Sequence, residues 1–202
     1  MKGLYLVTPD WDDTERMIAA TEAGLRGGAI LVQYRHKTAQ PTLRKQQAEA
    51  LLALCRRYEK PFIVNDYVEL GMEIGADGVH VGGTDMDVSK VRALLGPDRI
   101  VGASCYGSLE LARRAHAAGA SYVAFGGFYP SRVKKYEVTT SPTIVQESKA
   151  ELTLPVVVIG GMTSENARPL VKHGTDMVAV ISSVYMSEDP EKAARAFSEL
   201  FV

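Results

Sequence analysis

The chain alternates between short apolar runs and longer amphipathic segments from one end to the other. A short apolar run bounded by turn residues is typical of a buried strand, and a longer amphipathic segment is typical of a surface helix. Eight strands are predicted, at residues 3–8, 29–34, 61–64, 78–81, 100–103, 122–125, 156–159 and 177–181. Helices are predicted between them, including 13–26, 42–58, 68–74, 108–118, 164–173 and 190–201. This order predicts repeated βα units around a parallel sheet.

Small-residue turns precede several of the predicted strands. They read Gly27-Gly28-Ala29, Gly75-Ala76-Asp77, Gly119-Ala120-Ser121 and Gly174-Thr175-Asp176. Glycine just past a helix accepts the left-handed conformation that ends it, so these turns mark junctions between helix and strand. Eight strands in eight βα units predict an α/β fold with one domain, residues 1–202, which forms a closed (β/α)8 TIM barrel. An open doubly wound sheet is the main alternative, but no GxGxxG turn follows the first strand.

Composition narrows the class of protein further. The chain has 202 residues, 46% hydrophobic and 23% charged, which fits one domain with a substantial core. Its 23 basic and 24 acidic residues give a net charge of -1, so we expect neither nucleic acid nor a membrane as a partner. No apolar run approaches the roughly 20 residues that span a bilayer, and no signal peptide pattern opens the chain, so a cytoplasmic location is expected. The oligomeric state stays open, a homo-oligomer included.

Acidic residues follow two consecutive predicted strands. Asn65 and Asp66 come directly after the run 61–64, and Asp85 closes the segment 78–85. Neighbouring parallel strands lie about 4.8 Å apart, so groups past their carboxyl ends can meet at one ion. This pattern predicts a divalent metal site. The alternative is that each acid caps the helix after its strand, because Asp is a favoured N-cap residue.

Cations and small residues follow other strands at the same end of the barrel, where TIM barrels carry their active sites. In the segment Gln33-Tyr34-Arg35-His36-Lys37, alternation places Gln33, Arg35 and Lys37 on one side, and Arg suits phosphate. Ser104 follows the fifth predicted strand. A long loop at 125–135 combines glycines, aromatics and three cations, as active-site lids often do. Ordinary solvated loops are the alternative for both basic segments.

Glycines and a helix start follow the seventh strand, at Gly160-Gly161, and serines follow the eighth, at Ile181-Ser182-Ser183. Main-chain N–H groups approach an anion easily at such positions, as in the phosphate site that many barrels build there. The cationic corner and this cradle together predict two phosphorylated substrates. Mg²⁺ held by one or two carboxylates bridges well to phosphate oxygens, so the first corner suits a diphosphate leaving group.

A family resemblance rests on five segments: Val32-Gln33-Tyr34-Arg35-His36-Lys37, Asn65-Asp66, Ala76-Asp77-Gly78-Val79-His80 leading to Asp85, Tyr129-Pro130-Ser131 leading to Lys134, and Ile159-Gly160-Gly161. In order and position they resemble the thiamine-phosphate synthase and thiazole tautomerase family of (β/α)8 barrels, and the resemblance extends from Leu4 almost to the C-terminus. It implies a transferase that joins 4-amino-5-hydroxymethyl-2-methylpyrimidine diphosphate to 4-methyl-5-(2-hydroxyethyl)thiazole phosphate. Pyrophosphate leaves first, and the thiazole nitrogen then captures the methylene cation on the pyrimidine.

The resemblance also implies a role for individual residues. The catalytic cations are Arg35, Lys37 and Lys134. The pyrimidine diphosphate is bound by Gln33, Tyr34, Arg35, His36, Lys37, Asn65, Ser104 and Lys134. The thiazole phosphate is bound by Ser131, Arg132, Val133, Gly161, Ile181 and Ser182, chiefly through main-chain groups. The Mg²⁺ ligands are Asp66 and Asp85.

The chain departs from the family pattern in places. Many members have Gly-Pro where it has Gly126-Gly127, threonines in place of Ser131 and Val133, and glutamine in place of Gly83. A thiazole tautomerase is expected to carry a histidine near Gly127, which argues against that activity. A phosphate-binding sensor without catalysis is a second alternative. We expect His80 to be packed and hydrogen-bonded in a strand, and Cys105 to be a core residue rather than a nucleophile.

Overall fold

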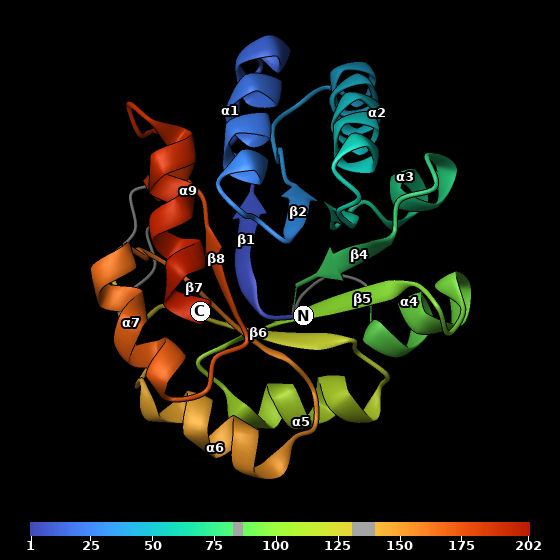
Figure 1. The fold of residues 1–202 in the computed structure, drawn as a ribbon. Coiled ribbons are helices and arrows are strands. Elements are labelled where there is room, and N and C mark those ends of the chain that lie inside the picture. The colour runs from blue at the N-terminus through green and yellow to red at the C-terminus, as the bar shows by residue number, and fades with distance from the viewer. Residues whose placement is uncertain (83–86, 131–139) are drawn as a thin grey trace.

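The computed structural model describes residues 1–82, 87–130 and 140–202, and these form a closed barrel of parallel strands (Figure 1). Each strand pairs with the next in sequence, and β8 pairs back with β1. The strands are β1 Gly3–Val7, β2 Leu31–Tyr34, β3 Phe62–Asn65, β4 Gly78–Val81, β5 Ile100–Tyr106, β6 Tyr122–Gly126, β7 Val156–Ile159 and β8 Met177–Val180. The predicted (β/α)8 barrel is confirmed, and the open sheet is excluded.

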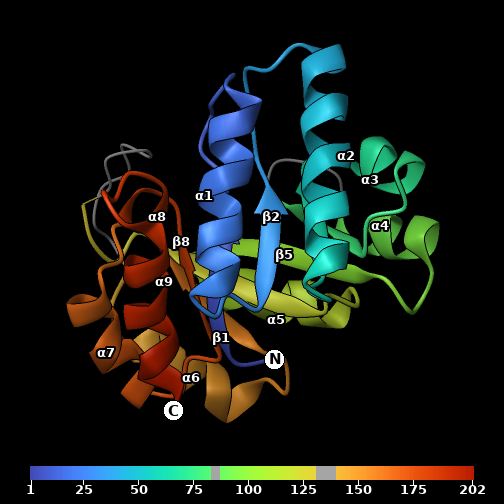
Figure 2. The same ribbon diagram turned by 45° about the horizontal axis from the view of Figure 1, so that its top comes forward.

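Helices surround the barrel on the outside, as Figure 1 and the tilted view in Figure 2 show. They are α1 Thr14–Arg26, α2 Pro41–Arg57, α3 Val68–Glu73, α4 Val88–Leu95, α5 Leu109–Ala117, α6 Thr143–Glu151, α7 Ser164–Lys172, α8 Ser182–Tyr185 and α9 Pro190–Ser198, followed by the 3-10 turn η1 Glu199–Phe201. Among the described residues, no helix combines the length and the apolar composition that crossing a bilayer requires.

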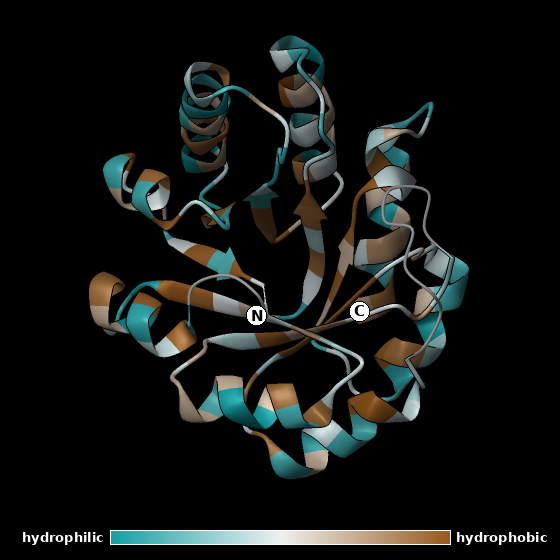
Figure 3. Ribbon diagram, turned by 180° about the vertical axis from the view of Figure 1, so that it is seen from behind, coloured by the Kyte–Doolittle hydropathy of each residue, from teal (hydrophilic) through white to brown (hydrophobic). Residues whose placement is uncertain are grey.

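The strands are buried on both faces, which explains their nearly continuous apolar sequences. One set of side chains fills the barrel and includes Tyr5, Leu31, Ile63, Tyr122 and Met177. The alternate side chains point outward and pack beneath the helices. In Figure 3 the strands are mostly brown or white, whereas the helices combine brown and teal. The barrel is therefore a filled core, and only the ends of its strands are open to ligands.

Polar clamps close the amino ends of neighbouring strands. The carboxylate of Asp77, just before β4, accepts a hydrogen bond at 2.8 Å from the amide of Phe62, the first residue of β3. Arg56 on α2 holds the same carboxylate at 2.8 Å. The clamp gives the first amide of β3 a partner that no neighbouring strand supplies.

The same clamp occurs twice more around the described barrel. Before β6, the Ser121 hydroxyl accepts from the amide of Val101 in β5 at 3.0 Å. Before β8, the Asp176 carboxylate accepts from the amide of Val156 in β7 at 2.8 Å. Each acceptor again contacts a helix cation at 2.9 Å, namely Arg92 for Ser121 and Lys149 for Asp176. The turns that the sequence marked as junctions thus also carry the side chains that join strands in pairs.

β5 continues well past its predicted end at Ala103. β5 runs from Ile100 to Tyr106, with a register shift against β6 between Ser104 and Tyr106. Ser104 and Cys105 therefore lie inside the strand, not after it. Cys105 is fully buried in the outer core, and burial raises the pKa of its thiol to about 12. A neutral, buried thiol is a core residue, as expected, and not a nucleophile.

Candidate active site

Side chains from separate strands meet in a small cavity at the carboxyl end of the barrel. Its volume is about 40 Å³, and its lining residues are Tyr5, Val7, Gln33, Arg35, Asn65, His80, Ser104, Ala124, Val157, Ile159 and Ala179. Four of the residues predicted to bind the pyrimidine substrate line this cavity: Gln33, Arg35, Asn65 and Ser104. The structure therefore brings together groups that are up to 71 positions apart in the sequence.

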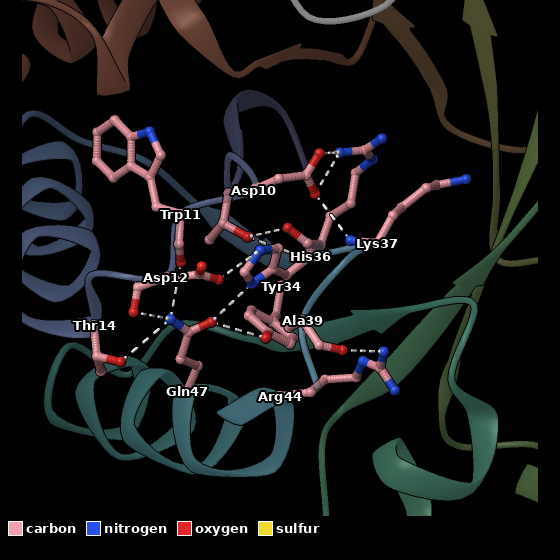
Figure 4. Close-up of polar contacts among 12 residues, drawn as sticks. Asp10, Trp11, Asp12, Thr14, Tyr34, His36, Lys37, Ala39, Arg44 and Gln47 are labelled. Carbon is pink, nitrogen blue, oxygen red and sulfur yellow. Dashed lines mark hydrogen bonds and ion pairs between the residues drawn. The ribbon is translucent and has the colours of Figure 1, made fainter. Parts of the chain in front are cut away.

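Arg35 is fixed at the rim of this cavity by an acid that the sequence analysis missed. Its Nη1 atom lies 3.1 and 3.0 Å from the two carboxylate oxygens of Asp10, which follows β1 (Figure 4). Thr8 holds the main chain of Arg35 by donating to its carbonyl at 2.9 Å and accepting from its amide at 2.8 Å. Only 9% of the Arg35 side chain is exposed. A guanidinium held this way keeps one orientation before any ligand arrives.

The Arg35 Nε atom is buried and has no hydrogen-bond partner within residues 1–82, 87–130 and 140–202. Leaving a charged donor buried without a partner is costly. An anion oxygen at the cavity rim would satisfy it, and phosphate matches guanidinium geometry well. The orphaned donor therefore points to an anion as the natural ligand of this corner.

Lys37 and Asp66 face each other beside Arg35. The Lys37 Nζ atom lies 3.5 Å from Oδ2 of Asp66, and the lysine side chain is 54% exposed. Asp66 has a φ of 61°, in the left-handed region that few residues other than glycine adopt. Its amide donates to the carbonyl of His80 in β4 at 2.9 Å, which holds this conformation. Such backbone strain is common at functional sites.

Helix capping does not explain Asp66, and the N-cap of the helix after β4 is a different acid from the predicted metal ligand. The N-cap of α3 is Tyr67, so Asp66 lies one residue too early to cap that helix. The N-cap of α4 is Asp87, whose side chain accepts from the amide of Ser89 at 2.8 Å. Asp85 itself lies outside the described residues.

A divalent cation fits the chemistry of this corner. In the described part of the chain, no three His, Cys, Asp or Glu side chains cluster as a complete metal cage. Mg²⁺ does not need one, because it typically takes one or two carboxylates and completes its shell with water and substrate phosphates. The Asp66 carboxylate is 22% exposed and supplies a hard oxygen donor next to the cations.

Tyr34 and His36 point the other way from their neighbours in sequence. The Tyr34 hydroxyl donates to Oε1 of Gln47 on α2 at 2.9 Å, and His36 Nδ1 lies 3.2 Å from the same atom (Figure 4). His36 Nε2 also lies 3.4 Å from Asp12. Alternation along an extended chain explains the arrangement, since Gln33 and Arg35 take the inner side. The structure does not bring these two side chains to the cavity, so only their main chain remains near it.

Glycine is required at the predicted phosphate cradle. Gly161 has a φ of 63°, and a Cβ atom there would lie 2.3 Å from the carbonyl oxygen of Pro130. Asn166 on α7 donates to the Gly161 carbonyl at 3.0 Å. Ser183 on α8 donates to the carbonyl of Met162, so the loops after β7 and β8 are joined.

The loop of Gly161 is thus joined to α8, whose first residue is Ser182 and whose N-cap is Ile181, the two residues predicted to complete a phosphate cradle. The other predicted residues of this subsite and the third catalytic cation lie outside the described residues: Ser131, Arg132, Val133 and Lys134.

A buried polar chain crosses the barrel beneath the cavity. Gln33 Nε2 donates to the Tyr5 hydroxyl at 2.5 Å, and the Tyr5 and Tyr122 hydroxyls lie 2.8 Å apart. His80 joins Tyr122 to Ser104, with 2.8 Å on each side of its ring. The expectation that His80 is packed and hydrogen-bonded is confirmed. The sequence analysis missed Tyr5 and Tyr122, because a core tyrosine in a strand gives no signal beyond its apolar character.

Comparison with known proteins decides the family. The family described as "Thiamine monophosphate synthase" matches residues 4–184. A thiamine-phosphate synthase of Janthinobacterium sp. (strain Marseille) is 64% identical over 201 residues, covering 100% of this chain and 97% of the relative. The chain belongs to the thiamine-phosphate synthase family. A thiamine-phosphate synthase of Methylobacillus flagellatus is 47% identical, with 100% and 96% of the two chains covered.

A solved structure of the thiamine-phosphate synthase family agrees with the barrel described above. Thiamine phosphate pyrophosphorylase from Pyrococcus furiosus has a TM-score of 0.86 and 32% identity, and the match covers 98% of this chain and 95% of that one. Membership of this family makes the chain an enzyme of the transferase class and places it in thiamine biosynthesis. The resemblance in the five sequence segments is thereby confirmed at the level of the whole chain.

Proposed function

We propose that this enzyme couples 4-amino-5-hydroxymethyl-2-methylpyrimidine diphosphate to 4-methyl-5-(2-hydroxyethyl)thiazole phosphate, giving thiamine phosphate and pyrophosphate. From the carboxylated form of the thiazole, CO2 is released as well. The observation that carries the proposal is the orphaned Arg35 Nε donor at the rim of the cavity. This donor supports a ligand whose anionic group binds Arg35 while its ring enters the cavity of the barrel. The second anion is proposed to bind at the loop of Gly161, where the backbone admits only glycine.

The diphosphate corner works by positioning and charge. Arg35 and Lys37 bind the leaving oxygens, and Lys134 is proposed to join them from the loop after β6. Asp66 and Asp85 would hold Mg²⁺, which neutralises charge on the departing pyrophosphate when it is bound. Preorganised cations beside a developing anion lower the barrier without any reorganisation at the moment of reaction.

The pyrimidine ring is held by Gln33, Asn65 and Ser104 while its bond to the diphosphate oxygen breaks. The bonding electrons leave with pyrophosphate, and the ring carries the positive charge on its methylene carbon. The thiazole nitrogen then forms the new C–N bond. No protein nucleophile is needed in this sequence, in agreement with the buried, neutral thiol of Cys105.

A coupling assay tests the proposal directly. Purified protein is mixed with both substrates and Mg²⁺, and pyrophosphate and thiamine phosphate are measured together. Equal yields of the two products support the synthase. Conversion of a thiazole isomer alone indicates a tautomerase, and binding without turnover indicates a sensor.

A matched pair of lysine variants makes the assay specific to the diphosphate corner. Lys37→Ala should lower kcat at least tenfold. Lys45→Ala is the control, because Lys45 is similarly exposed at 46% but pairs with Glu73 between α2 and α3. Equal effects of the two variants would argue against a role for Lys37.

The cytoplasmic location and the absence of nucleic-acid and membrane partners stay predictions from the sequence.

A further inference from the structure

The polar chain across the barrel has a direction. Each tyrosine hydroxyl carries one hydrogen and stands between two partners, so it can donate to only one of them. Gln33 Nε2 donates to Tyr5, so Tyr5 donates to Tyr122. Tyr122 must then donate to Nδ1 of the imidazole that follows. All the hydrogen bonds of this polar chain therefore point the same way, from Gln33 toward His80.

His80 extends the same order of donor and acceptor to Ser104. A neutral imidazole has one donor nitrogen and one acceptor nitrogen. Because Nδ1 accepts from Tyr122, Nε2 carries the hydrogen and donates to the Ser104 hydroxyl at 2.8 Å. The Ser104 hydroxyl is then left with its own hydrogen to donate elsewhere. Both Ser104 and the distant Gln33 line the cavity.

The two ends of the chain are therefore complementary. Gln33 uses one of its two amide hydrogens on Tyr5 and keeps its carbonyl oxygen as an acceptor. Ser104 accepts from His80 with one of its two lone pairs and keeps its hydrogen as a donor. Reversing the direction of the hydrogen bonds would exchange the donor and acceptor roles of Gln33 and Ser104 together. Every residue between them would have to exchange its own donor and acceptor as well. The cavity thus offers one acceptor and one donor whose identities are coupled through the core.

The middle of this polar chain lies in the packed interior of the barrel. Tyr5 and Tyr122 are at most 1% exposed, with rings 6.0 Å apart in an edge-to-face contact, and His80 stacks on Tyr122 at 5.6 Å. A Cβ atom at Gly102 would lie 2.2 Å from the Tyr122 hydroxyl and 2.6 Å from His80 Nδ1. Burial raises the pKa of both tyrosines, so each keeps its hydrogen.

We propose that Tyr5, Tyr122 and His80 are positioning residues that fix the hydrogen-bonding sense of the cavity and so select the pyrimidine. The cavity would accept a ring with a donor group facing Gln33 and an acceptor facing Ser104, which describes an amino group beside a ring nitrogen. The 4-oxo analogue presents the reverse pattern, with an acceptor toward the Gln33 carbonyl and a donor toward the Ser104 hydroxyl hydrogen. A site built to hydrogen-bond a substrate rejects such an analogue strongly. This inference rests on the proposed function.

The first test compares two diphosphates, the 4-amino pyrimidine and its 4-oxo analogue. The wild-type enzyme should prefer the amino compound in kcat/KM, and Tyr122→Phe should reduce that preference at least tenfold while the KM for thiazole phosphate is unchanged. Tyr185→Phe is the matched control, because it also removes a buried tyrosine hydroxyl, bonded at 2.9 Å to Thr21 outside the cavity. A wild-type enzyme without preference, or equal effects of the two variants, contradicts the inference.

A double-mutant cycle separates a connected chain from two independent contacts. Tyr5→Phe and Tyr122→Phe each interrupt the same chain, so the double variant should lose no more discrimination than the stronger single variant. Fully multiplicative losses would mean that the two tyrosines act separately. Such a result would overturn the coupling even if each variant alone lowers activity.

A spectroscopic test does not depend on turnover. The ¹⁵N chemical shifts of the His80 ring should report one neutral tautomer with the hydrogen on Nε2, and Tyr122→Phe should give a mixture of tautomers. Hydrogen on Nδ1 in the wild-type protein contradicts the inference. Absence of coupling activity together with the expected ¹⁵N result would contradict the proposed function while leaving the directed chain intact.

Discussion

Asp10 binds Arg35 through both of its carboxylate oxygens, at 3.0 and 3.1 Å from the same Nη1 atom. Oδ1 of the same carboxylate also accepts from the amide of Lys37 at 2.9 Å. One acid that follows β1 therefore positions both cations that follow β2. We expect this contact to matter for catalysis, because a small displacement of a positioned charge has a large effect on rate.

Removing the Asp10 carboxylate should weaken catalysis more than folding. Asp10→Ala is expected to lower kcat about tenfold, because Arg35 and the Lys37 amide lose their common acceptor. Asp12→Ala is a suitable control, since the Asp12 side chain is 84% exposed and contacts only His36 among the described ion pairs. Steady-state kinetics of both variants, with thermal unfolding to compare stability, checks this. Equal kcat values would mean that Arg35 keeps its position without Asp10.

The proposed metal ligand can be tested by its dependence on Mg²⁺. Asp66→Asn should lower turnover at least tenfold, which corresponds to about 1.4 kcal/mol of barrier, and should raise the Mg²⁺ concentration needed for half-maximal activity. Asp87→Asn is the control, because Asn replaces Asp well at the N-cap of α4. Titrating Mg²⁺ against activity distinguishes the two. An unchanged titration curve for Asp66→Asn would remove that residue from the metal site.

The phosphate cradle can be tested with two glycines of similar backbone conformation. Gly161→Ala should raise the KM for thiazole phosphate at least tenfold and leave the KM for the pyrimidine diphosphate nearly unchanged, because the added Cβ meets the Pro130 carbonyl. Gly75→Ala is the control, since Gly75 has a φ of 70° but open space around its Cβ position. A rise in KM for both substrates in Gly161→Ala would show a general distortion instead.

Because two thiols are buried, we expect the free energy of unfolding to fall in alkaline solution. Burial raises the pKa of Cys55 and of Cys105 from the ordinary value of 9.0 to about 12. Between these values the unfolded chain releases protons that the folded chain retains, so the free energy of unfolding falls as pH rises. Below pH 9.0 this contribution to stability is complete.

Urea unfolding of the wild-type protein and of a Cys55→Ala, Cys105→Ala variant at about pH 8 and about pH 10 measures this effect. Comparing the two proteins cancels the titration of other groups. The wild-type protein should lose more stability over this interval than the variant. Parallel losses would mean that the thiols ionise in the folded protein.

Much of the fold could be predicted from sequence because each strand is buried on both faces. That burial produces eight separate apolar runs, and the glycine turns locate the helix ends. Prediction failed where local pattern and tertiary structure differ. α8 has four residues and no helical repeat of its own, and β5 continues past Ala103 because Ser104 and Cys105 alternate between cavity and outer core.

The sequence predicts which residues belong to the candidate site, but not how they are arranged in space. The sequence identified Gln33, Arg35 and Asn65, and the structure places all three at one cavity. Period-two alternation separates Gln33 and Arg35 from Tyr34 and His36, whereas the family resemblance assigns all four residues to one ligand. Asp10 was missed because it is one of three acids in a short stretch, and nothing local marks the one that meets Arg35.

The three polar clamps at the amino ends of the strands have a consequence for how the barrel folds. Each joins residues no more than 20 positions apart, such as Asp176 and Val156. Closure of the barrel instead pairs Gly3 with Met177, at nearly opposite ends of the chain. Because short loops close at lower entropic cost, the clamped pairs β3–β4, β5–β6 and β7–β8 are expected to form early, with β1 and β2 completing the barrel last.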